Sequence, residues 1–491
     1  MTAAFPLETI ALDRAASANL HRQLYSQLRG LIERRALPSG SALPSTRLLS
    51  KDMGIGRNTV IAAYDQLALE GYLRSRQGAP PLVIDLPVAS ASAGKTPSPG
   101  GYQISRRGQI MLSQPYHHGK PGLHAFHPGL PDSDNFPFNT WSKLLTRRAK
   151  LARHDLFGAY HITGYPPLRE AIARYLGASR GVGCSPDQII ITNGAQSAFD
   201  LLARILLDPG DTVWMEEPGY YGACAAFLSA GAKLAPLHVG DRGWRLEPPK
   251  DPPRLIFVTP SCHHPLGVTM PMEQRLNLIR LAENWKSWII EDDYDSEYRF
   301  QGQPIPALQG IGGANRVVYV GTFAKVLFPA MRLGFMVVPE VMRDGLVAGL
   351  SATGQFAPLL TQAALADFIS EGHLTRHLRR MRRLYAARRQ LFMDLCDSHL
   401  GDWLHLRRTE SGIQLVGLFR QDRDDRAIAA AAAAQGVNVS PLSMQYRHDR
   451  QQHGLVLGFA AAGEKATRKA MTTLREVFRD TPADRPIGPS R

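Results

Sequence analysis

From residue 125 onward, short apolar runs alternate with amphipathic stretches, and this alternation restricts the fold more than any other feature. Runs such as QIIIT (188–192) and RVVYV (316–320) have the length and composition of buried strands. SAFDLLARIL (197–206) and EQRLNLIRLAEN (273–284) have the apolar spacing of helices. The alternation predicts an α/β domain with a largely parallel sheet. Further strands are expected at TVWM (212–215), LIFVT (255–259) and SWII (287–290).

Polar residues follow several of these runs, where ligands bind in parallel α/β sheets. TNGAQ (192–196) is a small-residue turn that opens a helix, whose free N–H groups suit a phosphate. EDDYD (291–295) follows one strand, and Lys325 follows the next, with Arg332 further along. Each element alone is common, since a lysine after a strand is usually a surface residue. Together, a phosphate cradle, a carboxylate, a phenol and a lysine suit pyridoxal 5′-phosphate (PLP).

The N-terminal part has a different pattern, with LHRQLYSQLRGLI (20–32) forming one helical stripe. LPSTRLLSKDMG (43–54) and IGRNTVIAAYDQLALEGYL (55–73) predict two short helices joined by a tight glycine turn, as in a helix-turn-helix. A generic three-helix bundle is the alternative. The first turns of the two helices offer side chains suited to phosphates and base edges, namely Thr46, Arg47, Arg57, Asn58 and Thr59.

Between these parts, residues 85–124 are rich in Ala, Ser, Gly and Pro without apolar periodicity. They are expected to be a flexible linker between a DNA-binding domain (10–84) and a second domain (125–491). Two domains also fit the length of 491 residues, which exceeds what one core accommodates. The net charge of +14 permits attraction to a polyanion, but on its own it is weak support. The densest basic stretch, HLRRMRRLYAARR (377–389), favours a solvated helix face over a nucleic-acid patch.

Several classes of protein are not expected. The chain has no apolar run of about 18 residues, so no membrane span is expected. The start, MTAAFPLETIALDR, lacks a basic and then apolar leader, so a cytoplasmic location is expected. The four cysteines have no paired spacing, which argues against disulfides and a zinc site. The adjacent pair His263 and His264 lacks further spaced ligands, so no metal is expected.

The stretch LPSTRLLSKDMGIGRNTVIAAYDQLALEGYL resembles the winged helix-turn-helix of the GntR superfamily of bacterial transcription regulators, over roughly residues 18–78. A departure follows it, because RSRQGAPPLVI (74–84) has Pro80 and Pro81 where the family usually has a Gly-rich wing. The wing's second strand is therefore expected to be shortened or shifted. The resemblance implies contacts to operator DNA from Ser45, Thr46, Arg47, Arg57, Asn58 and Thr59.

The remainder, from about residue 120, resembles the aminotransferase-like domain of MocR-type regulators, with motifs such as HPGLPDSDNFP (127–137), GYPPLREAIARYL (164–176) and GTFAKVLFPAMRLGF (321–335). Such regulators fuse a GntR-type domain to a fold-type I PLP domain, and the resemblance implies a domain-swapped homodimer. It implies Lys325 as the Schiff-base lysine. The other cofactor contacts that it implies are Asp292 at the pyridine nitrogen, Tyr294 at the phenolic oxygen, Thr322, Arg332, Ala195 and Gln196 at the phosphate, and Tyr220 beside the ring.

Three departures from that pattern bear on the activity. Ala324 stands where family members often have Ser, and His264 stands where aminotransferases usually have an Asn that bonds the cofactor. His264 either takes over that hydrogen bond or packs. Val456 aligns with the arginine that holds the substrate carboxylate in aminotransferases, so recognition of a carboxylate would depend on Arg447 or Arg450 nearby.

The favoured hypothesis is a DNA-binding transcription regulator in which PLP on Lys325 takes part in sensing a small amine or amino-acid effector, or is itself the signal. Little or no net turnover is expected, although an aminotransferase half-reaction is compatible with the residues. One alternative is an active PLP aminotransferase with a DNA-binding appendage. Another is a DNA-binding protein whose PLP fold has lost its cofactor. The sequence does not distinguish an activator from a repressor.

Overall fold

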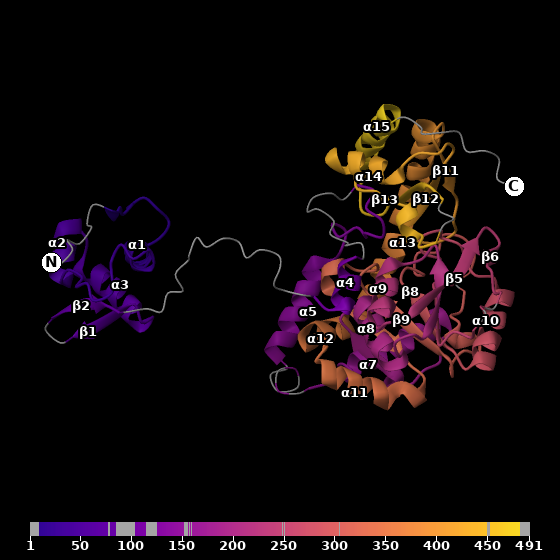
Figure 1. The fold of residues 1–491 in the computed structure, drawn as a ribbon, viewed down its shortest axis with the longest axis horizontal. Coiled ribbons are helices and arrows are strands. Elements are labelled where there is room, and N and C mark those ends of the chain that lie inside the picture. The colour runs from indigo at the N-terminus through magenta and orange to yellow at the C-terminus, as the bar shows by residue number, and fades with distance from the viewer. Residues whose placement is uncertain are drawn as a thin grey trace. The chain divides into compact units, whose positions relative to one another are not determined.

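A computed structural model of the chain describes residues 9–76, 79–84, 104–113, 125–151, 156, 158, 160–247, 249, 251–303, 305–448 and 452–481. The chain divides into two compact units, Met1–Gln103 and Ile104–Arg491 (Figure 1). Most of the expected linker, 85–103 and 114–124, lies outside the described residues. Its remaining part forms a short helix, α4 (Arg106–Leu112), which packs against α9 of the second unit. No helix in the described ranges is long and apolar enough to cross a membrane.

The N-terminal unit contains three helices and a two-stranded sheet. Leu24, Leu28, Val60 and Leu67 lie fully buried between the helices, which explains the apolar stripes of the sequence. Gly54 ends the second helix at φ 61°, a left-handed conformation that glycine adopts without strain. The elements are α1 (Leu20–Glu33), α2 (Thr46–Met53), α3 (Arg57–Leu69), β1 (Leu73–Arg76) and β2 (Ala79–Val83).

The wing carries the expected irregularity. β2 contains Pro80 and Pro81 and pairs antiparallel with β1, and the register shifts between Arg74 and Arg76. The strand is therefore shifted rather than shortened. Proline is tolerated here because the two-stranded sheet consists of edge strands.

The second unit is built on an eight-stranded mixed sheet in the order β3-β10-β9-β8-β7-β4-β5-β6. The five strands predicted from apolar runs are all present, and β5, β6 and β10 are additional. The strands are β3 (Ile189–Thr192), β4 (Thr212–Glu217), β5 (Lys233–Gly240), β6 (Gly243–Trp244), β7 (Leu255–Val258), β8 (Trp288–Asp293), β9 (Val317–Thr322) and β10 (Gly334–Val337).

Helices cover both faces of this sheet. Alternate residues of β3 show the division, because Ile190 packs with α8, α9 and α11, whereas Ile189 and Ile191 pack with α7, α12 and α13. The helices around the sheet are α5 (Phe138–Leu151), α7 (Pro166–Arg180), α8 (Ala195–Leu206), α9 (Tyr221–Ser229), α10 (Met272–Trp285), α11 (Arg343–Thr353), α12 (Leu359–Ser370) and α13 (His373–Leu400).

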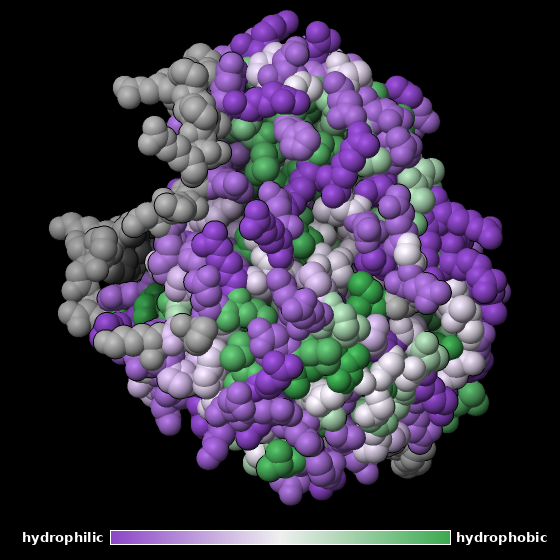
Figure 2. Space-filling model, turned by 90° about the vertical axis from the view of Figure 1, so that its right-hand side faces the viewer, coloured by the Kyte–Doolittle hydropathy of each residue, from purple (hydrophilic) through white to green (hydrophobic). Residues whose placement is uncertain are grey.

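A small lobe follows the long helix α13 and lies to one side of the large sheet (Figure 1). It has a four-stranded antiparallel sheet in the order β11-β12-β14-β13. Its elements are β11 (Leu404–Arg407), β12 (Gln414–Phe419), α14 (Asp425–Ala434), β13 (Ser440–Pro441), β14 (Gly454–Gly458) and α15 (Glu464–Asp480). On the side of α10 and β6, hydrophilic residues cover most of the surface and hydrophobic residues occur in small groups (Figure 2).

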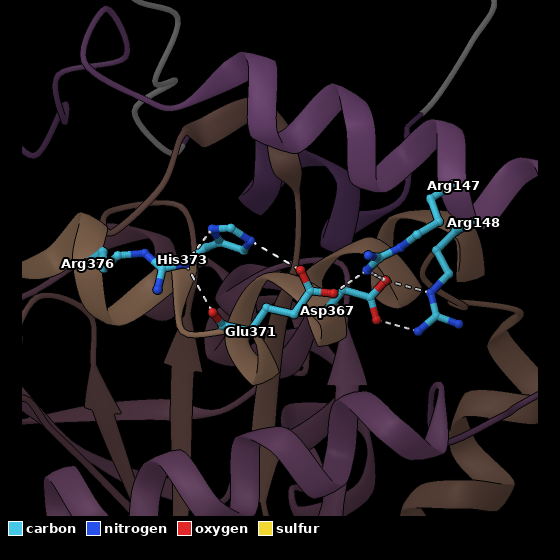
Figure 3. A network of polar contacts seen from close by, with 6 residues as sticks. All are labelled: Arg147, Arg148, Asp367, Glu371, His373 and Arg376. Carbon is cyan, nitrogen blue, oxygen red and sulfur yellow. Dashed lines mark hydrogen bonds and ion pairs between the residues drawn. The ribbon is translucent and has the colours of Figure 1, made fainter.

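Ion pairs join two of the covering helices. Arg147 and Arg148 of α5 both bind Asp367 of α12, with Arg147 Nη2 2.6 Å from Asp367 Oδ2 (Figure 3). Arg147 also pairs with Glu371, which contacts His373 at the start of α13. The arginines of this part of the helical layer are thus matched by carboxylates.

Candidate functional site

The first turns of α2 and α3 lie together in the N-terminal unit. Ser45 caps α2, because its hydroxyl accepts the Leu48 N–H at 3.3 Å. Arg57 Nε donates to Thr46 Oγ1 at 3.4 Å. The structure gives Arg47 and Asn58 no polar contact within the described residues, and both are exposed. Thr59 is half-buried beside them. The six residues expected at DNA therefore occupy two adjacent helix starts.

In the second unit, the strand register brings the predicted site residues together. Gly334, at the start of β10, pairs with Thr192 at the end of β3 and with Thr322 at the end of β9. Asp292 of β8 pairs with Val320 of β9. The loops that follow β3, β8 and β9 therefore leave the same edge of the sheet, which is where an α/β sheet binds its ligands.

Lys325 lies in the loop after β9, and its Nζ donates to the carbonyl oxygen of Gly129 at 2.7 Å. A Cβ added at Gly129 would lie 2.6 Å from Nζ, so a larger residue at this position would push the lysine amine away from its present place. Burial lowers the pKa of Lys325, while Asp295 and Asp292 act in the opposite direction. A lowered pKa increases the fraction of the amine that is neutral, and the neutral amine is the form that attacks an aldehyde.

Asp292 is 6% exposed, and its Oδ1 has no hydrogen-bond partner within the described part of the chain. Burial, followed by the neighbouring Asp293, raises the pKa of Asp292 well above its usual range, and Lys325 partly opposes this shift. A buried carboxyl without a donor is unfavourable. A cationic N–H placed against Oδ1 would remove that cost.

Three aromatic side chains near Asp292 contact one another. The His264 ring makes edge contacts with Tyr220 and Tyr294, at centroid distances of 5.5 Å and 6.0 Å. Tyr294 donates through its hydroxyl to Cys262 Sγ at 3.8 Å. Burial, then Asp292, raises the pKa of Tyr220 to about 12. His264 Nδ1 also lies 3.2 Å from Gln414 Nε2 of the small lobe, so it is held by packing and a polar contact.

The start of α8 supplies the expected cradle. Gly194, its N-cap, has φ 88°, and the first-turn N–H groups of Ala195 and Gln196 follow it. The hydroxyl of Ser197 is buried without a partner in the described ranges. Gln196 Nε2 donates to Gly222 O at 2.8 Å, beside the Tyr220 ring.

Arg332 and Thr322 complete this end of the site. Arg332 is exposed and adopts a left-handed conformation at φ 51°, and its guanidinium has no hydrogen bond or ion pair to other described residues. Its charge nevertheless acts on Tyr220, whose pKa it lowers against the larger effect of burial. Thr322 Oγ1 accepts the Ala324 N–H at 3.2 Å. A free guanidinium near a helix start suits an anion.

Sequence reasoning missed three residues of this site: Gly129, Asp295 and Gln414. Asp295 is fully buried behind Lys325, and burial raises its pKa to about 7. Asp295 lies within the quoted EDDYD motif, which was a usable signal. Gly129 lies within the quoted HPGLPDSDNFP motif, although nothing in that motif marks its contact with Lys325. Gln414 comes from a distant segment that no motif marks.

Residues 125–129 fasten the site to the small lobe. The carbonyl oxygens of Ala125 and Phe126 accept the N–H groups of Asn438 at 3.0 Å and Gly458 at 2.9 Å. Four residues after Ala125, Gly129 O accepts Lys325 Nζ. This strap of backbone carbonyls therefore contacts both lobes.

The residues considered for a carboxylate lie elsewhere. Val456 is 1% exposed in an apolar core and pairs with Val416, so it faces no ligand. The backbone N–H of Arg447 donates to Glu217 Oε1 at 2.6 Å, and its side chain lines a cavity of about 320 Å³ with Tyr221 and Cys224. Arg450 lies outside the described residues.

This set of groups fits PLP. Asp292 offers an unpartnered buried acceptor, Lys325 an amine with a lowered pKa, and the α8 start with Arg332 an anion cradle. The described residues hold no group of three or more His, Cys, Asp or Glu side chains suited to a metal ion.

Comparisons with known proteins agree with both parts. Residues 20–83 match the family model of bacterial regulatory proteins, gntR family, and residues 130–453 match that of aminotransferase class I and II. The chain is 51% identical to the probable rhizopine catabolism regulatory protein MocR of Rhizobium meliloti, over 96% of each chain. It is 32% identical to the transcriptional regulator TauR of Rhodobacter capsulatus, over 97% of this chain and 100% of the relative. It is 31% identical to the pyridoxine biosynthesis transcriptional regulator PdxR of Corynebacterium glutamicum, over 95% of this chain and 98% of the relative.

Solved structures show the fold of the larger unit. An archaeal alanine:glyoxylate aminotransferase superposes with a TM-score of 0.67 at 24% identity, covering 72% of this chain and 90% of that one. A kynurenine aminotransferase from Pyrococcus horikoshii gives the same TM-score at 23% identity, covering 77% and 95%. The second unit therefore has the fold-type I aminotransferase fold.

Proposed function

Because the chain belongs to the MocR-type regulators of the GntR family, which are DNA-binding transcription regulators, we propose that its second unit holds PLP on Lys325 and uses it to sense a small amine or amino acid, or PLP itself. The unpartnered Oδ1 of Asp292 beside Lys325 is the observation that carries this proposal. A buried carboxylate in that position needs a cationic donor, which the protonated ring nitrogen of PLP supplies.

Each group of the site has a separate task. Lys325 Nζ, with its pKa lowered by burial, bonds the cofactor, and Asp292 accepts the ring N–H. Tyr294 and His264 face the phenolic oxygen, while Tyr220 flanks the ring. The phosphate is held by Arg332, Thr322 and the first N–H groups of α8, at Ala195 and Gln196.

When bound, PLP supplies an aldehyde that combines with primary amines. The Lys325 amine would hold that aldehyde, and an effector amine would compete for it. Because the free Lys325 Nζ donates to Gly129 O at 2.7 Å, occupancy of the amine would change this contact. This changes DNA affinity only if the effector binds two conformations of the protein unequally.

DNA contact is assigned to the paired helix starts of the N-terminal unit. Ser45, Thr46 and Arg47 at α2 hold the phosphate backbone. Arg57, Asn58 and Thr59 at α3 reach base edges. Each chain carries one helix-turn-helix unit, so a domain-swapped homodimer contacts two operator half-sites.

The buried Val456 argues against an active aminotransferase. By the resemblance to aminotransferases it stands at the position of the carboxylate-binding arginine, and its side chain is buried in an apolar core. Steady formation of a keto acid from an amino donor would refute the proposal that this regulator has no catalytic turnover.

Absorption spectroscopy tests the proposal. Full-length protein mixed with PLP is expected to gain a visible band, and borohydride treatment to fix the cofactor's mass on the peptide that contains Lys325. Amines are then added singly, beginning with rhizopine, for which the 51% identical relative is named. A protein that shows no such band after incubation with PLP and removal of the unbound PLP would refute the site.

A further inference from the structure

A second cavity lies away from Lys325, between helices α7, α12 and α13. Its volume is about 450 Å³, within the range of small-molecule sites. None of its residues belongs to the PLP site. The cavity is lined by Ala171, Arg174, Tyr175, Ala178, Ser179, Ile369, Ser370, Thr375, Leu378, Arg379 and Arg382.

Three arginines converge on this cavity with little opposing charge. Arg174 faces Glu170 one turn away at 3.9 Å, a long contact between two exposed side chains. Arg382 Nε donates to the backbone oxygen of Glu297 at 2.5 Å, which engages no carboxylate. Within the part of the chain that the structure describes, the Arg379 side chain has no hydrogen bond or ion pair.

Other arginines of the same helical layer do have side-chain partners. Arg147 and Arg148 share Asp367, and Arg376 bonds the backbone of Glu371 and the ring of His373 (Figure 3). None of these three arginines lines the cavity.

The carboxyl of Glu297, whose backbone oxygen Arg382 contacts, is engaged by another residue of the cavity wall. Glu297 accepts the Tyr175 hydroxyl at 2.9 Å, and burial raises its pKa, which weakens its charge. The cavity also has apolar atoms from Ile369, Leu378 and Ala171, and hydroxyls from Ser179 and Thr375. Guanidinium groups beside an apolar surface suit a ligand with an anionic end and an apolar body.

We propose that this cavity is a second ligand site, which binds a small organic phosphate through Arg174, Arg379 and Arg382. Arginine forks match phosphate geometry with paired N–H donors. The hollow and the apolar atoms that line it beside the arginines favour a small molecule with an apolar body over duplex DNA. The site is independent of PLP binding at Lys325.

Titration calorimetry of full-length protein tests the assignment, with PLP fixed on Lys325 by borohydride and all unbound PLP removed, so that the phosphate cradle at Arg332 is filled and the second cavity is left open. Inorganic phosphate is titrated first, and phenyl phosphate is titrated second to probe the apolar floor. Binding is expected, tighter for phenyl phosphate. Arg379→Ala is expected to weaken it by about tenfold or more, the usual effect of losing a charge-assisted hydrogen bond.

Arg383→Ala is the matched control, because Arg383 lies on the same helix, is exposed and does not line the cavity. It should bind phosphate as the unaltered protein does. Arg174→Ala gives a second variant if Arg379→Ala lowers the melting temperature. No binding, or an equal loss with Arg383→Ala, would overturn the proposal. So would weaker DNA binding by Arg379→Ala with unchanged phosphate binding, which would make the surface a DNA contact.

Discussion

Arg57 Nε lies 3.4 Å from Thr46 Oγ1, so the first turns of α3 and α2 are joined by a side-chain contact. The contact holds an exposed guanidinium beside a helix start that has free N–H groups. Arg57 is thereby presented with a restricted set of rotamers, which lowers the entropy cost of binding a base edge or phosphate.

Arg57→Ala is expected to weaken operator binding by about 10- to 100-fold, corresponding to about 1–3 kcal/mol for an arginine–base contact. Fluorescence anisotropy with labelled operator DNA measures this change. In a double-mutant cycle, Thr46→Val and Arg57→Ala should be non-additive, because the two side chains touch. Unchanged affinity in Arg57→Ala would remove α3 from the DNA interface.

Lys325→Ala is expected to prevent covalent capture of PLP and to abolish the effector response, while operator affinity in the absence of effector stays within about threefold. The reason is that Lys325 lies in a different unit from the helix-turn-helix. Borohydride labelling and anisotropy report the two properties separately. Lys233→Ala, at an exposed lysine, should change neither. A loss of DNA binding as large as that of Arg57→Ala would contradict this separation.

Asp292→Asn is expected to stabilise the cofactor-free protein and to weaken its binding of PLP. Without PLP, the change removes a buried carboxyl whose pKa is raised, so stability near neutral pH should increase. PLP affinity should fall by about 10- to 100-fold, because a charge-assisted hydrogen bond is lost. Thermal melting followed by tryptophan fluorescence tests both effects. All six tryptophans belong to the second unit, so the signal reports on it alone. A destabilised cofactor-free variant would argue against the assignment.

Glu216 predicts a pH dependence. It is buried and accepts the Trp244 indole N–H at 2.7 Å, and burial raises its pKa from 4.5 to about 8. The folded state therefore holds this proton more tightly than the unfolded state does. Stability from this group is greatest below about pH 4.5 and is lost as the pH rises towards about 8.

In Glu216→Gln the free energy of unfolding should fall less as the pH rises, by about 3 kcal/mol, because glutamine can accept the same hydrogen bonds and cannot ionise. Urea unfolding between pH 5 and 8.5, followed by tryptophan fluorescence, measures the slope. Glu283→Gln, at an exposed carboxylate of α10, should leave it unchanged. Parallel slopes for Glu216→Gln and the unaltered protein would refute the raised pKa.

The sequence predicted the centre of the large sheet better than its margins. β7, β8 and β9 are covered on both faces, so their residues form continuous apolar runs. β10 was missed because GFMV follows directly on the loop that carries Lys325 and Arg332. The antiparallel strands of the small lobe were also missed.

The candidate site divides in the same way. Residues at strand ends, such as Asp292 and Lys325, could be predicted because one strand positions each of them. The contact between Lys325 and Gly129 joins positions 196 apart in the chain, and no local pattern encodes it. The burial of Asp292 Oδ1 without a hydrogen-bond partner likewise depends on the surrounding packing, which no local pattern predicts.

The strap of residues 125–129 has a mechanical consequence. Two of its carbonyl oxygens accept hydrogen bonds from the small lobe, at Asn438 and Gly458, and a third accepts one from Lys325 in the large lobe. A ligand that engages the lysine amine would break the third hydrogen bond and leave the other two in place. The chemistry at Lys325 is therefore coupled to the connection between the two lobes, in a segment that follows the chain leading from the helix-turn-helix unit.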